Sequence, residues 1–156
     1  TLAEGAVTTI RDYLVANLPT KLDALDAAYG DGITLADIVT SYLAEQSLAT
    51  IPAFPVLFVI APASQIERWT PSVTDASHRL LIGVIAIDQD PETLRKRLYR
   101  YMRAIWEVLV AGRAAASFAY VIGPDARFEF SPIYSKDTQF MGDARVEVSM
   151  RLTEQQ

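Results

Sequence analysis

One continuous stretch, residues 79–112, constrains the fold of this chain more than any other part of the sequence. It begins with an almost unbroken apolar run bounded by polar residues, which is typical of a buried strand. Asp90 can then cap a helix, because its carboxylate can accept a hydrogen bond from a first-turn amide. Pro91 suits the first helical position, where its missing N–H is not needed. We therefore predict a strand followed by a long helix over about residues 91–111, which Gly112 ends.

The predicted helix has one apolar side and one basic side. Apolar residues recur every three or four positions, which is the period of an α-helix; they are Leu94, Leu98, Tyr101, Ile105 and Leu109. A helix of this kind packs its apolar side against another layer of structure. Because the core excludes charge, we expect the basic residues to lie on the solvent side; they are Arg95, Lys96, Arg97, Arg100 and Arg103.

The N-terminal part of the chain is expected to be helical and then irregular. Apolar residues at helical spacing predict an amphipathic helix over residues 3–17, which Leu18 and Pro19 interrupt. Pro19 can begin a second, short helix that ends at Gly30. Residues 33–54 mix helical and β-type character, and we expect mostly loop there.

The sequence between the N-terminal part and the central strand predicts strands, a turn and a loop. Residues 55–61 predict a strand that is buried on both faces, and residues 65–69 predict a half-exposed strand after a turn at residues 62–63. Residues 71–77 are polar, and we expect them to form a loop.

Beyond the long helix, the sequence predicts two more strands and a loop. The strands are expected at residues 118–122 and 127–130, with a turn at residues 123–125 between them. Residues 132–143 are expected to form a loop that is long enough to reach a partner.

The chain ends on a strand in which apolar and polar residues alternate, and Val146 and Val148 fall on its apolar side. Strands on either side of one long helix predict an α+β fold, with a mainly antiparallel sheet packed against that helix and an N-terminal amphipathic helix. A chain of 156 residues fits a single domain, residues 1–156. Its longest apolar runs are too short to cross a bilayer, so we expect a soluble cytoplasmic product and no membrane partner.

The charge of the chain differs by region. Residues 1–60 hold seven acidic and two basic residues, whereas the remainder holds twelve of each, so the net charge of −5 lies in the N-terminal part. Oppositely charged surfaces could join copies of the chain head to tail. The candidate residues are Asp23 and Asp26 on the acidic side and Arg95, Arg97, Arg100 and Arg103 on the basic side. Two separate solvated surfaces explain the same pattern equally well.

Few residues are suited to catalysis. The chain has no cysteine, and its one histidine, His78, lies in a polar run where a surface loop or the start of a strand explains it better than a catalytic role. Asp88 and Asp90 follow a strand, but neither a glycine-containing loop nor a third carboxylate follows at the spacing of a calcium loop. We predict no enzyme activity, no metal and no cofactor. The basic helix also suits a nucleic acid, but in an acidic chain a solvated or protein-facing surface explains it better.

The segments of the chain occur in an order that is more informative than any one of them. They are an amphipathic helix, a proline-flanked strand, a strand ending in Asp, a long Arg- and Tyr-rich helix and two strands around a loop; the residues that mark them are Phe54 to Val59, Asp88, Asp90-Pro91-Glu92, Leu94 to Tyr101 and Phe140-Met141-Gly142. This order, over about residues 1–153, resembles that of the tail terminator and tail-completion proteins of long-tailed bacteriophages.

The resemblance implies a small α+β subunit that assembles as a ring, typically a hexamer, on the head-proximal end of the tail tube. Such a ring stops tube growth and docks the tail to the neck of the filled head, and genomic DNA passes through its hole. The implied partners are copies of the chain, the tail tube protein and a neck or head-completion protein, in a virion assembled in the host cytoplasm. No catalytic residue carries over. Another neck component, such as a connector protein, is an alternative, and a small-molecule-binding α+β domain is another.

The loop predicted at residues 132–143 is a candidate contact to a neighbouring tail or neck subunit, because loops are where recognition concentrates. Its candidate residues are Tyr134, Lys136, Asp137 and Phe140. An ordinary hairpin loop explains the same residues as well.

Overall fold

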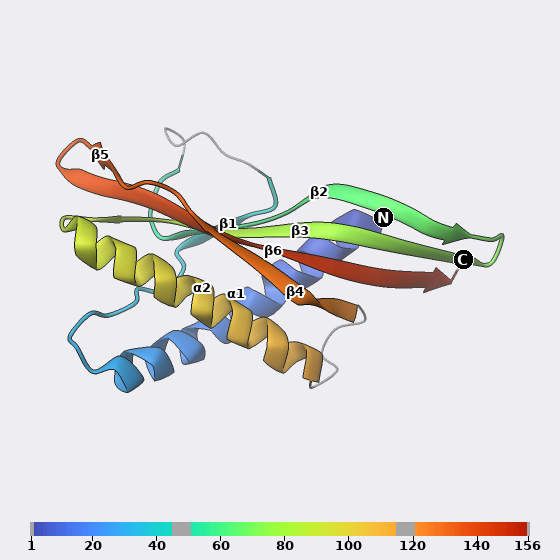
Figure 1. Cartoon of the computed structure of the whole chain (residues 1–156), viewed down its shortest axis with the longest axis horizontal. Coiled ribbons are helices and arrows are strands. Elements are labelled where there is room, and N and C mark those ends of the chain that lie inside the picture. The colour runs from blue at the N-terminus through green and yellow to red at the C-terminus, as the bar shows by residue number, and fades with distance from the viewer. Residues whose placement is uncertain (1, 45–50, 115–120, 156) are drawn as a thin grey trace.

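The computed structural model describes residues 2–44, 51–114 and 121–155. Within these ranges the chain has the α+β fold that the sequence predicts, with two helices packed on a six-stranded, mostly antiparallel sheet (Figure 1). The elements are α1 (Leu2–Tyr29), β1 (Thr40–Tyr42), β2 (Val56–Trp69), β3 (Val73–Asp88), α2 (Pro91–Ala114), β4 (Val121–Phe130), β5 (Tyr134–Lys136) and β6 (Gln139–Gln155). No helix in the described part of the chain is long and apolar enough to cross a membrane.

Helix α2 begins as the sequence predicts. Pro91 is its first residue, and the Asp90 carboxylate accepts hydrogen bonds from the Thr93 amide at 2.9 Å and from the Thr93 hydroxyl at 2.7 Å. These hydrogen bonds lower the pKa of Asp90. The cap therefore satisfies an amide that has no partner inside the helix, which fixes where α2 starts.

The apolar side of α2 is buried, and Leu94, Leu98 and Ile105 are fully enclosed in the core. The end of α2 differs from the prediction, because the helix passes Gly112 and ends at Ala114. Gly112 does not adopt the positive φ through which a glycine ends a helix, so it remains an ordinary helical residue.

One continuous helix, α1, replaces the two helices predicted on either side of Pro19. Pro19 removes a backbone hydrogen bond, at a cost of about 3 kcal/mol. Leu18 and Leu22 are both buried on the same side of α1, so the apolar side continues without a break past the proline. Burying each such side chain contributes about 1.5–3 kcal/mol, which offsets the missing bond. The helix ends at Gly30 as predicted, with a φ of 60° and a hydrogen bond from its amide to the Asp26 carbonyl at 3.0 Å.

The strand order is β1-β2-β3-β6-β4, and β5 pairs with β6. β1 runs parallel to β2, and the other neighbouring strands are antiparallel. β1 is a three-residue strand inside the region predicted as loop, residues 33–54, and it pairs only with residues 56–58 of β2. On β6, Val146 and Val148 are buried against the helices, as the alternation predicts.

β2 does not turn at residues 62–63 as the sequence predicts. It continues to Trp69, and its register with β3 is irregular between Ile60 and Ala63. Prolines are tolerated at such irregularities and on strands with an open side, because no ladder hydrogen bond is lost there. Pro62 therefore fits within the strand.

β3 also begins earlier than predicted, since it includes most of the predicted loop at residues 71–77. This segment is polar, but β2 pairs with it on one side and β6 on the other. Pairing on both sides outweighs the weak local preference of its residues.

The predicted loop at residues 132–143 is a β-hairpin, formed by β5 and the start of β6. Asp137 makes its turn with a φ of 55°, a conformation that Asp tolerates better than most residues. The turn predicted at residues 123–125 is instead an irregular register inside β4. The strand predicted at residues 118–122 lies partly outside the described residues.

The helices cover only one face of the sheet (Figure 1). The prediction that residues 55–61 are buried on both faces is therefore wrong. Leu57 and Val59 of β2 are fully buried, whereas Phe58 and Ile60 point the other way and are partly exposed. We call this second side of β2, β3, β4 and β6 the open face.

Candidate assembly surfaces

The basic side of α2 bonds to the end of α1 and to the segment that follows it. The Arg100 guanidinium pairs with the Asp31 carboxylate, with one N–O distance of 3.0 Å, and its central carbon lies 3.8 Å from the centre of the Tyr29 ring. Arg100 is therefore buried, and the prediction that it lies on the solvent side is wrong. Arginine can be buried here because a carboxylate and an aromatic face replace its hydration.

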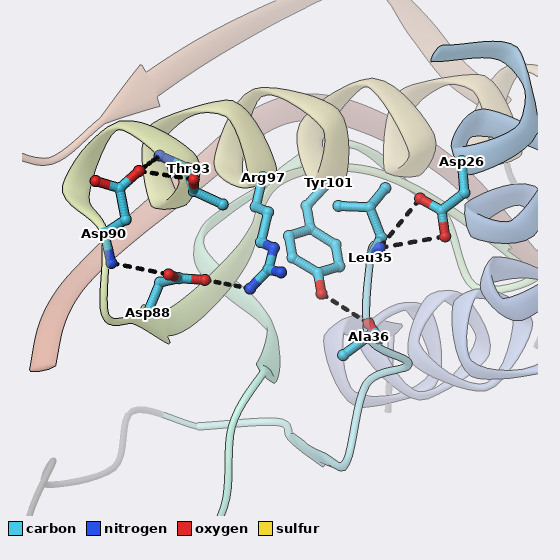
Figure 2. Close-up of polar contacts among 8 residues, drawn as sticks. All are labelled: Asp26, Leu35, Ala36, Asp88, Asp90, Thr93, Arg97 and Tyr101. Atoms are coloured by element: carbon cyan, nitrogen blue, oxygen red, sulfur yellow. Dashed lines mark hydrogen bonds and ion pairs between the residues drawn. The ribbon is translucent and has the colours of Figure 1, made fainter. Parts of the chain in front are cut away.

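The same segment is held by two further hydrogen bonds, which Figure 2 shows. The Tyr101 hydroxyl donates to the Ala36 carbonyl at 2.7 Å. The Leu35 amide donates to the Asp26 carboxylate at 3.0 Å. Asp26 was predicted as part of an acidic surface, and the structure gives it this contact within the chain.

The Asp31–Arg100 pair is expected to make the stability of the fold sensitive to acid. The hydrogen bond from Arg100 holds the pKa of Asp31 at about 2, below its usual 3.8. A folded-state pKa below the unfolded value means that the stabilisation is present above pH 3.8 and is lost as the pH falls toward about 2. We expect Asp31→Asn to be less stable than the parent at neutral pH, and the difference to shrink over that pH range in denaturant titrations.

Asp37→Asn is the matched control for this experiment. It removes an exposed carboxylate from the same segment, so it should keep the stability of the parent at neutral pH. If Asp31→Asn is as stable as the parent at neutral pH, the pair contributes nothing and the account of this segment is wrong.

The other basic residues of α2 that were predicted to form a surface also have partners within the chain. The contacts are Arg95 to the Ser131 carbonyl (2.7 Å), Lys96 to Glu92 (3.6 Å), Arg97 to Asp88 and Arg103 to Glu107 (3.1 Å). Figure 2 shows the pair at the end of β3. Cations that already have partners attract phosphates less strongly, which weighs against a nucleic-acid surface on α2.

Of the predicted acidic surface, Asp23 is exposed on α1. Contacts of these residues to a second chain stay predictions.

The four predicted contact residues of the β5–β6 hairpin differ in how exposed they are. Tyr134 is exposed, and the Lys136 ammonium lies 5.9 Å from the centre of the Phe54 ring. Asp137 forms the exposed turn. Phe140 lies at the start of β6 and is partly buried against the core. Tyr134 and Asp137 are therefore the two residues that remain most available to a partner.

An aromatic cluster at the β4 edge was not among the predicted sites. Tyr99 of α2 meets Phe130 of β4 edge to face, with ring centres 4.8 Å apart, and Trp106 meets Phe128 in the same way at 6.4 Å. These four residues form the aromatic seam. Tyr99 is 52% exposed, Phe128 39% and Phe130 37%. Aromatic residues are enriched in protein interfaces, so the aromatic seam is a candidate contact surface.

The open face carries ion pairs that cross between strands. The pairs are Arg79 with Glu147 (3.0 Å), Arg145 with Glu129 (2.9 Å) and Arg151 with Glu67 (2.9 Å). A hollow of about 200 Å³ lies beside them over β2, β3 and β6, and Gly83 lies at its floor between larger apolar residues. The hollow is open and mostly apolar; its charged lining residues are Asp143 and Arg145, and Arg145 is already paired with Glu129.

His78 is buried in β3, so the predicted surface loop is wrong; its Nδ1 lies 2.7 Å from the Ser64 hydroxyl, and burial lowers its pKa. No cluster of three or more possible metal ligands occurs in residues 2–44, 51–114 and 121–155. Compared with known proteins, the sequence matches no family model and no curated protein.

Proposed function

We propose that this chain is a structural virion protein that forms a ring, hexameric as the resemblance implies, at the head-proximal end of a phage tail tube. The ring ends tail growth, docks the tail to the head or neck and lets genomic DNA pass through its hole. Its partners are copies of itself, the tail tube protein and a neck or head-completion protein, in a virion assembled in the host cytoplasm. The order of sequence segments supports this proposal.

The observation that carries the proposal is that one sheet presents two dissimilar open edges. β1 pairs only with residues 56–58, so the rest of β2 has no strand outside it, and β4 ends the sheet on the other side, among the strands that the structure describes. A ring needs a heterologous interface, in which two different surfaces of each copy match. Unpaired strand edges are natural sites for such a contact, because their amides and carbonyls lack partners.

The distribution of charge supports the passage of DNA without binding. Arg79, Arg145 and Arg151 on the open face are paired with glutamates of other strands. On α2, Arg97 is paired with Asp88 and Arg103 with Glu107. Tight binding to DNA depends on cations that are free to neutralise phosphates. A surface of paired charges therefore suits a channel wall better than a DNA-binding site.

Light scattering over a range of protein and salt concentrations tests the ring. The subunit mass is 17.2 kDa, so six copies weigh about 100 kDa. We expect a discrete species near that mass. A protein that remains a monomer or dimer at every concentration would contradict a preformed ring.

A further inference from the structure

The two open edges of the sheet run in opposite directions. Along the order β2-β3-β6-β4 each neighbouring pair is antiparallel, so strand direction alternates over four strands and β2 opposes β4. From residue 59 to Trp69 the outer side of β2 has no strand partner in the described structure, and neither does the outer side of β4.

This alternation determines how copies can join around a ring. When copies are related by rotation about an axis that runs along the strands, the β2 edge of one copy faces the β4 edge of the next, and the two strands are antiparallel. Antiparallel pairing is slightly the more stable of the two arrangements. A two-fold dimer would instead pair β2 with β2 or β4 with β4, which leaves the other edge of each copy open.

Both edges also expose apolar side chains. Near the outer end of β2, Ile66 is 61% exposed and Trp69 is 66% exposed. On β4, Phe128 and Phe130 of the aromatic seam are partly exposed. Soluble proteins usually shorten, charge or cover such an edge, because it can otherwise pair with another chain. Pro62 and the register irregularities protect part of these edges, but the exposed apolar side chains on both of them favour a partner for each.

We propose that the partner of both edges is a second copy of this chain, with residues 59–69 of β2 pairing antiparallel with β4 (Val121–Phe130) of the next copy. The sheet then continues from copy to copy around the ring. Each junction satisfies the free backbone groups of two edges and covers their exposed apolar side chains. This inference rests on the ring proposed above and names the surfaces that close it.

Paired cysteines test the junction, and the chain suits the experiment because it has no cysteine of its own. Ala63→Cys or Gln65→Cys on β2 is combined with Arg127→Cys or Glu129→Cys on β4. All four positions lie on the open face, as their pairing with β3 and β6 shows. Within one chain two strands separate β2 from β4, roughly 14 Å at about 4.8 Å per strand. A disulfide needs Cα atoms within about 7 Å, so it can form only between copies.

Mild oxidation should convert at least one of the four double variants into a ladder of covalent multimers up to the size of the ring, which a reductant reverses. Each single variant should give dimers at most. A further control joins Gln65→Cys with Asp23→Cys, an exposed position on α1, and should give no ladder. Light scattering on the same samples before oxidation shows whether the ring is present.

The outcomes separate this inference from the proposed function. A ring-sized species in which none of the four pairs forms a ladder overturns the β2–β4 junction and leaves the ring intact. Variants and parent that are both monomeric, and that form no ladder, overturn the junction together with the preformed ring. A ladder in a ring-sized species establishes the junction.

Discussion

Replacing Ile105 by alanine is expected to lower the free energy of unfolding by about 2–5 kcal/mol. Ile105 is fully buried on the apolar side of α2, where that helix packs against α1 and the sheet. Alanine loses the transfer free energy of the deleted atoms and leaves a cavity that close-packed neighbours fill only in part. A domain of this size has a total stability of about 5–15 kcal/mol, so the loss is a large fraction of it. Urea unfolding followed by circular dichroism measures it.

Val15→Ala is the control for this experiment, because Val15 is an exposed apolar residue on α1. Its effect should stay within about 0.5 kcal/mol, as is usual for surface positions. An equally small effect of Ile105→Ala would mean that α2 does not pack on the sheet through this side.

Replacing Phe128 and Phe130 together by glutamate is expected to convert the proposed ring into monomers. Both residues lie at the β4 edge and contact α2 through the aromatic seam. Carboxylates at these positions would have to be desolvated when the edge meets a second copy, which costs free energy. Light scattering should show the mass falling from about 100 kDa to that of one subunit, 17.2 kDa.

Val15→Glu is the matched control, because Val15 is another exposed apolar residue and lies on α1 and not on an edge strand. It should keep the mass of the parent. Far-ultraviolet circular dichroism should show that the double glutamate variant remains folded. A folded double variant that keeps the ring mass would remove the β4 edge from the interface.

Local signals were enough to predict the best-defined parts of the fold. Asp90, Pro91 and the apolar stripe of α2 specify a helix start and a buried side by themselves. The alternation around Val146 specifies the inward side of β6 in the same way. These features depend on neighbours within a few residues, so they can be predicted from the sequence alone.

The errors occurred where distant contacts decide the structure. Pro19 stays inside α1 because the buried side of the helix continues past it, and residues 71–77 become a strand because β2 and β6 pair with them. Arg100 was predicted at the surface, since nothing near it in sequence reveals that Tyr29 and Asp31 lie against it. Composition and spacing carry no information on such partners.

The candidate surfaces were only partly predictable. Tyr99 and Trp106 lie seven residues apart on one side of α2, and Phe128 and Phe130 alternate on a strand, so each pair had a visible pattern. Their meeting across α2 and β4 depends on the strand order, in which β6 lies between β3 and β4. The open edges depend on the same order and could not be inferred from the sequence.

The most direct test of the proposed function is electron microscopy of phage tail tubes, polymerised from the tube protein that is the proposed partner, with and without this chain. The account predicts that added chain stops tube growth and that ring-shaped density caps one end of each tube. The Phe128→Glu and Phe130→Glu double variant should leave growth unaffected. Tubes that reach the same lengths with and without the parent chain, and that carry no density at either end, would contradict the account.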